Sequence, residues 1–434
     1  MDPVDDRVRD PAEEPQPVLV AAIRDATVRF VIGAVVQWVG PGFGQFAGQL
    51  NIRGEPLMAA PTGPGAGHRP NSERVLIDAR LLQGPGAGRG EGTYARGLLG
   101  GLLEEGFQDR ALLLLDADLE APVLPGEGWL TTTVRRRYHG RFAAYEDAVA
   151  LGTDLERIRP AAFHALRLGL PGRSPVPVAV TLHDLIPWAW GGARTLGEKI
   201  RHLPGKRLLR SADLVLAVSE SSAADARRFA RVARGRLRVI LEGVDPSFRP
   251  SSGAAEQVRT RWRLERPYLI YVGALDARKS PADLLRAWET AKAAGAACDL
   301  VIAGSPGAQA PPSLPGARLL GPVSREELVD LLSAAACLVF PSRYEGFGLP
   351  VLEAMACGTP AIAYSNSSLP EVAGDVGILV RDGDAETMGR KAAELIADPE
   401  LADRVRSAGL RHAAGFTWRR AAVEVIAAYA KLLP

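Results

Sequence analysis

The most informative stretch of the sequence carries two glutamates, Glu345 and Glu353, eight positions apart, with Gly346 and Gly348 between them. Glycine lets backbone N–H groups approach a ligand closely, and a helix that begins near Pro350 presents a partial positive charge to a phosphate. Carboxylates accept paired hydrogen bonds from vicinal sugar or ribose hydroxyls. The stretch therefore predicts a site for a phosphorylated sugar or nucleotide. For Glu353 alone, the alternative is a glutamate favoured by the helix dipole.

Two adjacent cations, Arg278 and Lys279, follow an apolar run at residues 268–272 that has the character of a buried strand. Ligands of open parallel sheets bind beyond the carboxyl ends of the strands, so this pair is placed to neutralise a diphosphate and its leaving-group charge. The alternative is an exposed turn with solvated charges.

The first half of the chain offers one histidine in the corresponding place. His183 follows directly after the expected strand at residues 176–182, and Asp184 is placed to orient its ring. A structural role for His183 is an equal alternative, and a structural role is favoured for His164, which follows a shorter apolar run. The glycine-rich run through Gly90 and Gly92 lacks a clean GxGxxG spacing. We expect a backbone-lined loop that abuts the acceptor or the donor phosphates, rather than a dinucleotide site.

Short apolar runs alternate with helical patterns along most of the chain, which predicts an α/β fold with parallel sheets covered on both faces. A Pro/Ser/Gly segment near residues 246–253 separates two such series. We expect a weakly ordered N-terminal extension at residues 1–72, one domain at residues 73–248 and a second at residues 249–434.

Composition narrows the class of protein. The chain has 434 residues, 47% hydrophobic and 24% charged, and its 52 basic and 50 acidic side chains nearly cancel to a formal charge of +2. This argues against a dedicated nucleic-acid binder. Three cysteines without a CxxC pair favour buried, reduced thiols, and no apolar run approaches the roughly 20 residues of a membrane span. The acidic N-terminus is unlike a signal peptide, so a cytoplasmic location is expected.

From Arg74 onward the sequence resembles the retaining GT-B glycosyltransferases of family four. The resemblance is carried by the E-x7-E signature of Glu345 and Glu353 with its surroundings, by Tyr271-Val272-Gly273 with Arg278-Lys279, by Val301-Ile302-Ala303-Gly304, by Leu369-Pro370-Glu371-Val372, and by Thr181-Leu182-His183-Asp184. It implies two Rossmann-like domains that face a central cleft, with the last helix packed back on the first domain.

The same resemblance implies roles for individual residues. Arg278 and Lys279 would hold the donor diphosphate in place of a metal ion, and Glu353 would hold the ribose hydroxyls. Glu345 with the backbone of Gly346, Phe347, Gly348 and Leu349 would hold the transferred sugar and its phosphates, and His183 would line the sugar site. No metal and no other cofactor is expected. Two positions depart from the family pattern: Glu242 stands where asparagine is usual, and Ser280 replaces another common asparagine.

The leading functional prediction is a retaining transferase that moves a hexose, with mannose from a guanosine-diphosphate donor as the candidate, onto a glycan or polyprenyl-linked acceptor in envelope or exopolysaccharide synthesis. The alternatives are an inactive GT-B subunit that binds a sugar nucleotide or a partner enzyme, and a nucleotide-sugar epimerase. Trp188 and Trp190 precede a basic segment at residues 194–210, which leaves open a peripheral contact with the inner face of a membrane; a solvated helix face is the favoured alternative.

Overall fold

The computed structural model describes residues 70–84, 87, 88, 90–136, 143–191, 196–305, 307 and 314–433. Most of the predicted N-terminal extension, through residue 69, lies outside the described residues. The described chain begins with a single 3-10 turn, η1 (Asn71–Glu73), immediately before the first strand.

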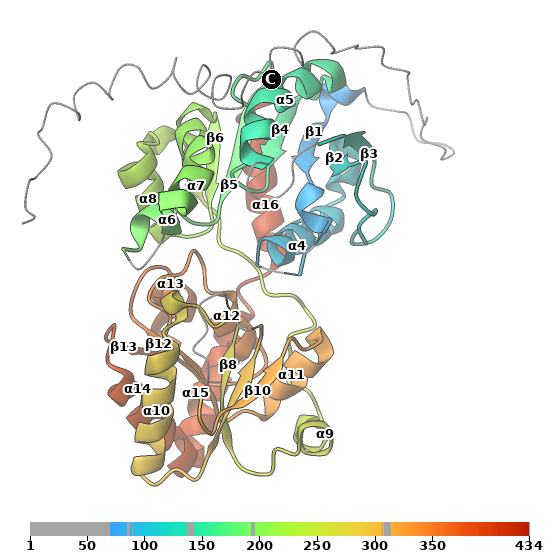
Figure 1. The fold of residues 1–434 in the computed structure, drawn as a ribbon. Coiled ribbons are helices and arrows are strands. Elements are labelled where there is room, and N and C mark those ends of the chain that lie inside the picture. The colour runs from blue at the N-terminus through green and yellow to red at the C-terminus, as the bar shows by residue number, and fades with distance from the viewer. Residues whose placement is uncertain are drawn as a thin grey trace, which may run out of the picture. The chain divides into compact units, whose positions relative to one another are not determined.

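The first half of the described chain builds one parallel sheet in the order β3-β2-β1-β4-β5-β6-β7 (Figure 1). Its strands are β1 (Val75–Asp78), β2 (Ala111–Asp116), β3 (Thr131–Val134), β4 (Ala162–Ala165), β5 (Val178–Leu182), β6 (Leu214–Ala217) and β7 (Leu237–Val239). The central strands are buried on both faces, because apolar side chains alternate to either side and helices cover both.

The second half builds a separate parallel sheet in the order β10-β9-β8-β11-β12-β13. Its strands are β8 (Tyr268–Val272), β9 (Asp299–Ala303), β10 (Arg318–Gly321), β11 (Cys337–Phe340), β12 (Ala361–Tyr364) and β13 (Ile378–Val380). Numbered within each half, both sheets run 3-2-1-4-5-6, the doubly wound order of a Rossmann fold, and the first sheet adds one edge strand. The predicted α/β class with two parallel sheets is confirmed.

Helices fill the connections between the strands. In the first half they are α4 (Gly90–Glu104), α5 (Ala143–Ile158), α6 (Ile186–Ala189), α7 (Leu196–Leu208) and α8 (Glu220–Ala230). In the second half they are α9 (Ala254–Trp262), α10 (Pro281–Ala293), α11 (Arg325–Ala334), α12 (Leu349–Ala356), α13 (Leu369–Ala373), α14 (Ala385–Ala397) and α15 (Pro399–Ala413). The last helix is α16 (Trp418–Tyr429).

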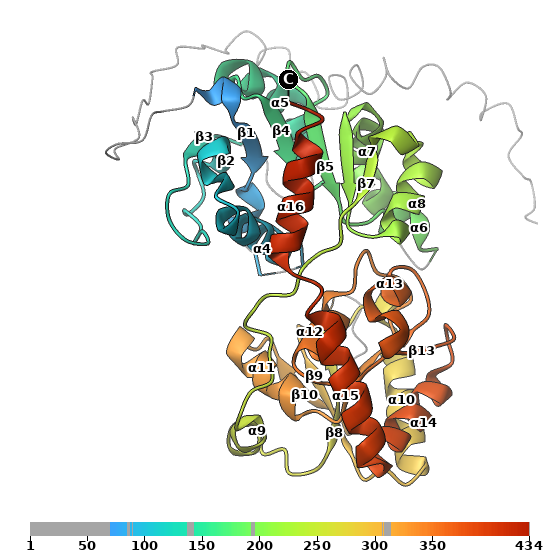
Figure 2. The same cartoon turned by 180° about the vertical axis from the view of Figure 1, so that it is seen from behind.

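The last helix belongs spatially to the first half, because α16 packs on α4 beside β4 and β5 (Figure 2). The indole of Trp418 lies against Gly97 and Gly101 of α4, where any Cβ would collide with it or its backbone. The two segments that join the halves also pair with each other, since Val244 forms a parallel bridge with Thr417 and its N–H donates to Phe416 (3.0 Å). Gly243 is needed there, because a Cβ would lie 2.3 Å from the Trp418 nitrogen.

His164 lies inside a strand rather than after one, which corrects the expected placement. It is fully buried in β4, where Nδ1 bonds the Tyr429 hydroxyl (2.6 Å) and Nε2 bonds the Thr181 hydroxyl (2.9 Å). Burial lowers its pKa to about 3, so the ring is neutral. The structural role predicted for His164 follows from these two bonds, which tie α16 to the sheet.

Candidate functional site

The candidate site forms at the topological switch point of the second sheet, between β8 and β11, where the strand order reverses. The loop after β8 carries Arg278 and Lys279 in the short 3-10 turn η7 (Ala277–Lys279), which the Asp276 side chain caps by accepting from the Lys279 N–H (3.2 Å). The loop after β11 carries Glu345. The carboxyl ends of adjacent parallel strands share one edge, so these loops meet there.

Both cations bond the same carboxylate. Lys279 Nζ donates to Glu345 Oε1, and Arg278 Nη1 lies 3.0 Å from Glu345 Oε2. The Lys279 ammonium also stands 4.6 Å from the centre of the Phe340 ring. These side chains are between 10% and 13% exposed, so their charges interact with little solvent screening.

Burial would raise the pKa of Glu345, but the neighbouring charges of Lys279 and Arg278 outweigh it and hold the pKa below its usual value. Burial lowers the pKa of Lys279, and Glu345 opposes that shift. The cluster therefore holds two cations against one deeply placed anion.

One donor of this cluster is unused. Arg278 Nε is buried and has no hydrogen-bond partner within the described residues. A buried guanidinium N–H without a partner is costly unless a ligand accepts from it. The orphan donor, on one of two cations that share a single buried carboxylate, fits a bound anion such as a diphosphate.

The loop of residues 346–349, called here the glycine loop, closes over this cluster. Gly348 adopts a φ of +113° just before α12, a conformation that favours glycine, and Leu349 and Pro350 open the helix. Phe347 is buried with its ring 6.4 Å from the Phe416 ring centre. Gly346 presses against the first half: a Cβ there would lie 2.2 Å from the His183 carbonyl oxygen.

Hydrogen bonds fix the same loop from both halves. Ser219 and Ser222 donate to the Gly346 carbonyl at 2.6 and 3.2 Å, and Ser368 donates to the Phe347 carbonyl at 2.6 Å. The Glu371 carboxylate accepts from the N–H groups of Glu220 and Ser221 at the start of α8. No motif predicted the three serines as site residues, because their partners in this loop are distant in sequence and meet them only in the folded chain.

Glu353 lies one turn into α12, apart from the Glu345 cluster. Burial raises its pKa to about 7; Arg325 opposes the shift, and the charges of Asp245 and Glu242 add to it. Asp245 also forms an ion pair with Arg325 at the first turn of α11. Glu353 therefore lies near a set of charged side chains different from those around Glu345. This is expected if the two glutamates contact different parts of one ligand.

His183 lies after β5, as predicted, and its backbone reaches the glycine loop. Its carbonyl accepts from the Ser222 hydroxyl (2.7 Å), while its ring stands edge-on to Tyr94 at 4.8 Å between centres. Nε2 bonds the Leu166 carbonyl (3.0 Å), and Nδ1 lies 3.5 Å from Glu242 Oε1. Both ring nitrogens are therefore occupied by protein groups.

The glycine-rich loop of the first half is only partly described. Gly90 opens α4 and has open space around it, whereas a Cβ on Gly92 would lie 2.1 Å from the Ala87 carbonyl oxygen. The packing of the loop on itself thus accounts for Gly92. The predicted contact of Gly90 and Gly92 with acceptor or phosphate stays a prediction.

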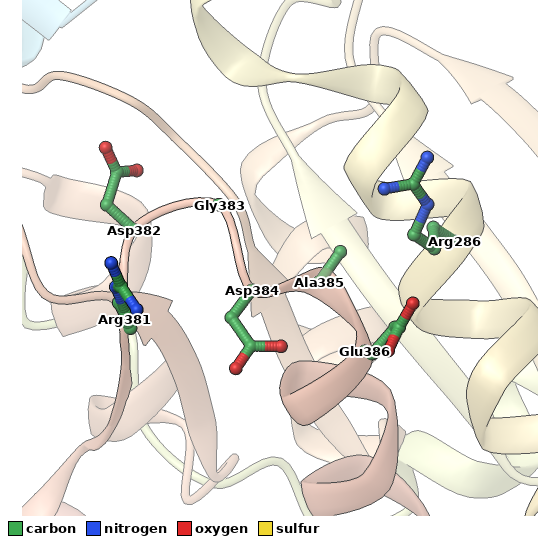
Figure 3. A pocket seen from close by; sticks show the side chains of 7 residues that line it. All are labelled: Arg286, Arg381, Asp382, Gly383, Asp384, Ala385 and Glu386. Carbon is green, nitrogen blue, oxygen red and sulfur yellow. The ribbon is translucent and has the colours of Figure 1, made fainter.

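Two shallow surface pockets lie away from this cluster. One of about 370 Å³ follows β13 and is lined by Arg286 of α10 and by residues 381–386 (Figure 3). The other, of about 400 Å³, lies between α8 and β7. We assign neither to the site, because neither is lined by Arg278, Lys279, Glu345 or residues 346–349; the second pocket is lined instead by Arg227, Arg234 and Arg238. In the part of the chain that the structure describes, no group of three His, Cys, Asp or Glu side chains is arranged to hold a metal ion.

Comparison with known protein families agrees with the fold. A model described as "Glycosyl transferases group 1" matches residues 254–412, and one described as "Glycosyltransferase Family 4" matches residues 128–248. Parallel-sheet halves of this kind, with the charged loops at the second switch point, define a GT-B glycosyltransferase scaffold. Both models describe glycosyltransferases, and the chain resembles them over these two ranges.

Curated relatives align over part of their length. "O-antigen chain mannosyltransferase B" of Escherichia coli is 30% identical over 240 residues, which cover 52% of this chain and 62% of that protein. "D-inositol 3-phosphate glycosyltransferase" of Streptomyces avermitilis is 32% identical over 252 residues, 53% of each chain. The chain thus spans between about half and two thirds of the length of these relatives.

Solved structures share the fold. Sucrose-phosphate synthase from Thermosynechococcus elongatus superposes with a TM-score of 0.66 at 23% identity, covering 83% of this chain and 99% of that one. Anabaena HepE, solved in complex with UDP and glucose, superposes with a TM-score of 0.62 at 16% identity, covering 83% and 100%. At these identities the likeness concerns the fold.

Proposed function

We propose that the protein transfers a hexose from a nucleoside-diphosphate sugar to a hydroxyl of a glycan or polyprenyl-linked acceptor, with retention at the anomeric carbon. The observation that carries this is the Arg278 and Lys279 pair around Glu345, with Arg278 Nε left without a partner. A donor diphosphate supplies the anion that this cluster lacks.

The chemistry follows from this placement. The bond between the anomeric carbon and the diphosphate oxygen breaks, and a bond to the acceptor oxygen forms on the same face. The departing phosphate oxygen takes the acceptor proton, so the two electrons of the broken bond leave with the diphosphate. Arg278 and Lys279 stabilise that charge as it develops. Because both cations are already held in place, the protein need not reorganise when the charge appears. We therefore propose that no metal ion is required.

The sugar and acceptor are proposed from chemistry and from the relatives. One relative is named for mannose transfer, and several are named for an inositol phosphate acceptor. We propose mannose, from a guanosine-diphosphate donor, as the first sugar to test. A lipid-linked glycan and inositol 3-phosphate are the two acceptors to compare.

The first experiment is a calorimetric panel of UDP, GDP, ADP and their common sugar conjugates, with EDTA present. One nucleotide should bind well, and Lys279→Ala and Glu353→Ala should abolish its binding. Lys292→Ala is the matched control, because Lys292 lies over the Trp288 ring on α10, outside the site. Absence of binding to every nucleotide would instead favour the alternative of a non-catalytic scaffold that binds a partner enzyme.

A lipid-linked acceptor would bring the protein to a membrane surface. Within the described residues, no helix is both long and apolar enough to span a bilayer. The predicted anchor Trp188 is half-buried with Lys206 Nζ 4.7 Å from its ring centre, so it is engaged within the protein. The predicted contact through Trp190 and the basic segment at residues 194–210 stays a prediction, and we also consider another basic surface.

Such a surface lies on α8 and the segment that follows it. Between residues 220 and 239 six arginines stand against two carboxylates, Glu220 and Asp225. The arginines are Arg227, Arg228, Arg231, Arg234, Arg236 and Arg238. We propose that this basic surface contacts anionic lipid. Cosedimentation with phosphatidylglycerol vesicles should fail for a variant with Arg228, Arg231 and Arg234 changed to glutamate. Equal binding of that variant, or of the protein to neutral phosphatidylcholine, would contradict the contact.

A further inference from the structure

A buried carboxylate lies beside His183 and has no place in the predicted site. Glu242 follows β7 on the segment that leads to the second half, and it is 4% exposed. Its Oε1 lies 3.5 Å from His183 Nδ1. The other ring nitrogen, Nε2, bonds the Leu166 carbonyl, which can only accept, so Nε2 carries a hydrogen. The other titratable proton of the His183–Glu242 pair therefore lies between His183 Nδ1 and the Glu242 carboxylate.

Neighbouring charged groups keep this proton bound to the His183–Glu242 pair. Burial by itself would lower the pKa of His183, but Glu242 and Glu91 outweigh it and raise the pKa to about 9. Burial also raises the pKa of Glu242, against the opposing charge of His183. Other groups facing the ring are Tyr94 on α4, the neutral His164 on β4, and Asp184 in the same loop. With a pKa of about 9, the His183 ring is protonated at neutral pH.

The pair of His183 and Glu242 contacts the glycine loop through the backbone of His183. The His183 carbonyl accepts from Ser222 and lies so close to Gly346 that no side chain fits between them. The charge of Glu242 also contributes to the raised pKa of Glu353. One carboxylate on the connecting segment is therefore coupled to two residues expected to bind the donor.

We propose that Glu242 is a positioning residue that holds the His183 ring as a cation and thereby fixes the His183 backbone against the glycine loop. This rests on the transferase function proposed above. An imidazolium with both N–H groups occupied cannot deprotonate the acceptor. Its role is instead to place a positive charge in the part of the first half that contacts the glycine loop, and to fix the backbone that supports Gly346.

Three variants separate charge from position. Glu242→Gln keeps the shape and can donate to Nδ1, so the ring stays held but becomes neutral above its ordinary pKa of about 6.5. Glu242→Ala removes both the charge and the bond. Glu105→Gln is the matched control, because Glu105 pairs with Arg419 in the same half, outside the site.

The expected result for Glu242→Gln is a kcat about 10-fold below wild type at pH 8 with a KM for donor within about twofold. This is less than the 100-fold or greater loss of a group that touches the developing anion directly. Lowering the pH to 5.5 protonates the His183 ring of Glu242→Gln again. The kcat values of wild type and Glu242→Gln should then agree within about twofold. Glu242→Ala should show the loss without the recovery. If the ratio of the wild-type kcat to the Glu242→Gln kcat were the same at pH 8 and pH 5.5, the proposal would be overturned.

A second measurement does not depend on activity. In protein labelled with ¹⁵N at histidine, the His183 ring, assigned with a His183→Asn variant, should titrate near pH 9 in wild type and at or below about 6.5 in Glu242→Gln. An unchanged His183 titration would also overturn the proposal. If wild type bound no nucleotide sugar, the proposed function would fail, while this titration would still decide whether Glu242 charges the ring.

Discussion

The two switch points, between β1 and β4 and between β8 and β11, hold the same place in sheets of the same strand order, yet their charges are balanced differently. In the second half two cations share the buried carboxylate of Glu345, the partly exposed Asp276 carboxylate lies 3.7 Å from Arg278, and one buried N–H has no partner. In the first half Arg80 bonds Asp78 and Asp147 at 2.6 and 2.8 Å, and Arg136 bonds Asp147 and Asp154.

The first network is complete without a ligand. Arg80 and Asp147 are almost fully buried, and each cation there meets two carboxylates. Burial would raise the pKa of Asp78, but Arg80 reverses this and holds the pKa below its usual value. The same topology can thus hold either a structural ion network or an anion site. The balance of charge, rather than the presence of ion pairs, separates the two.

The largest expected effect is on transfer by Lys279→Ala. Removing one of the two cations takes away charge stabilisation where the diphosphate departs, so kcat should fall on the order of 1,000-fold with little change in unfolding midpoint. Steady-state kinetics and urea unfolding check both parts. Lys292→Ala should behave as wild type. Full turnover by Lys279→Ala would remove the distinction between the two switch points.

The matching change in the first half should act on stability. Arg80→Ala leaves Asp78 and Asp147 buried with fewer partners, which should cost about 3–5 kcal/mol of unfolding free energy. At temperatures where the variant is folded, its affinity for donor should equal that of wild type. Arg259→Ala, which removes an exposed ion pair with Glu256, should leave the urea midpoint unchanged. Loss of donor binding by a folded Arg80→Ala protein would mean that the first network is also a ligand site.

Gly346→Ala tests how closely the halves approach at the site. A Cβ at this position would lie 2.2 Å from the His183 carbonyl oxygen, so the loop must shift. A displacement of about 1 Å can cost on the order of 100-fold in rate, and we expect a loss of that size in kcat over KM. Gly235→Ala is the control, since no atom lies within 4 Å of its added Cβ. Unimpaired transfer by Gly346→Ala would show that this contact opens during turnover.

The smallest expected effect concerns pH and the buried His164 of the first half. Its pKa falls from 6.5 to about 3 on folding, so the unfolded chain binds a proton that the folded chain does not. Its stabilising effect is present above pH 6.5 and is lost as the pH falls toward 3, by up to about 1.4 kcal/mol per pH unit. Urea unfolding between pH 7 and pH 4 measures the slope. His164→Gln, which cannot titrate, should flatten that slope; an unchanged slope would contradict the assignment.

The second switch point was predictable from the sequence because local signals mark it. Apolar runs predicted β8 and β11, and the residues that follow such strands are candidates for a ligand site, so Arg278, Lys279 and Glu345 were each predicted to bind the donor. Helical patterns at residues 282–294, 324–334 and 385–397 predict three helices, which the structure confirms to within a residue as α10, α11 and α14. The predicted burial of all three cysteines is also confirmed.

The first switch point was not predictable in the same way. β3 has the half-exposed sequence Thr131–Val134, and β4 contains His164, so neither forms a continuous apolar run. The pairing of Arg80 with Asp147 joins positions 67 residues apart and depends on how α5 packs. Glu242 was recognised as an unusual residue, but its partner His183 could not be identified before β5 and the connecting segment were placed side by side.

The position of α16 has a consequence for how the chain folds during synthesis. Tyr429 bonds His164 of β4 in the first half, and Trp418 fills the space above Gly97 of α4. A ribosome adds about 5–20 residues per second, and domains that emerge first ordinarily fold first. Here the earlier half leaves the exit tunnel with part of its interior still to be translated. Its native core is completed only after the later half has been made, so the two halves finish folding in the reverse of the order in which they begin.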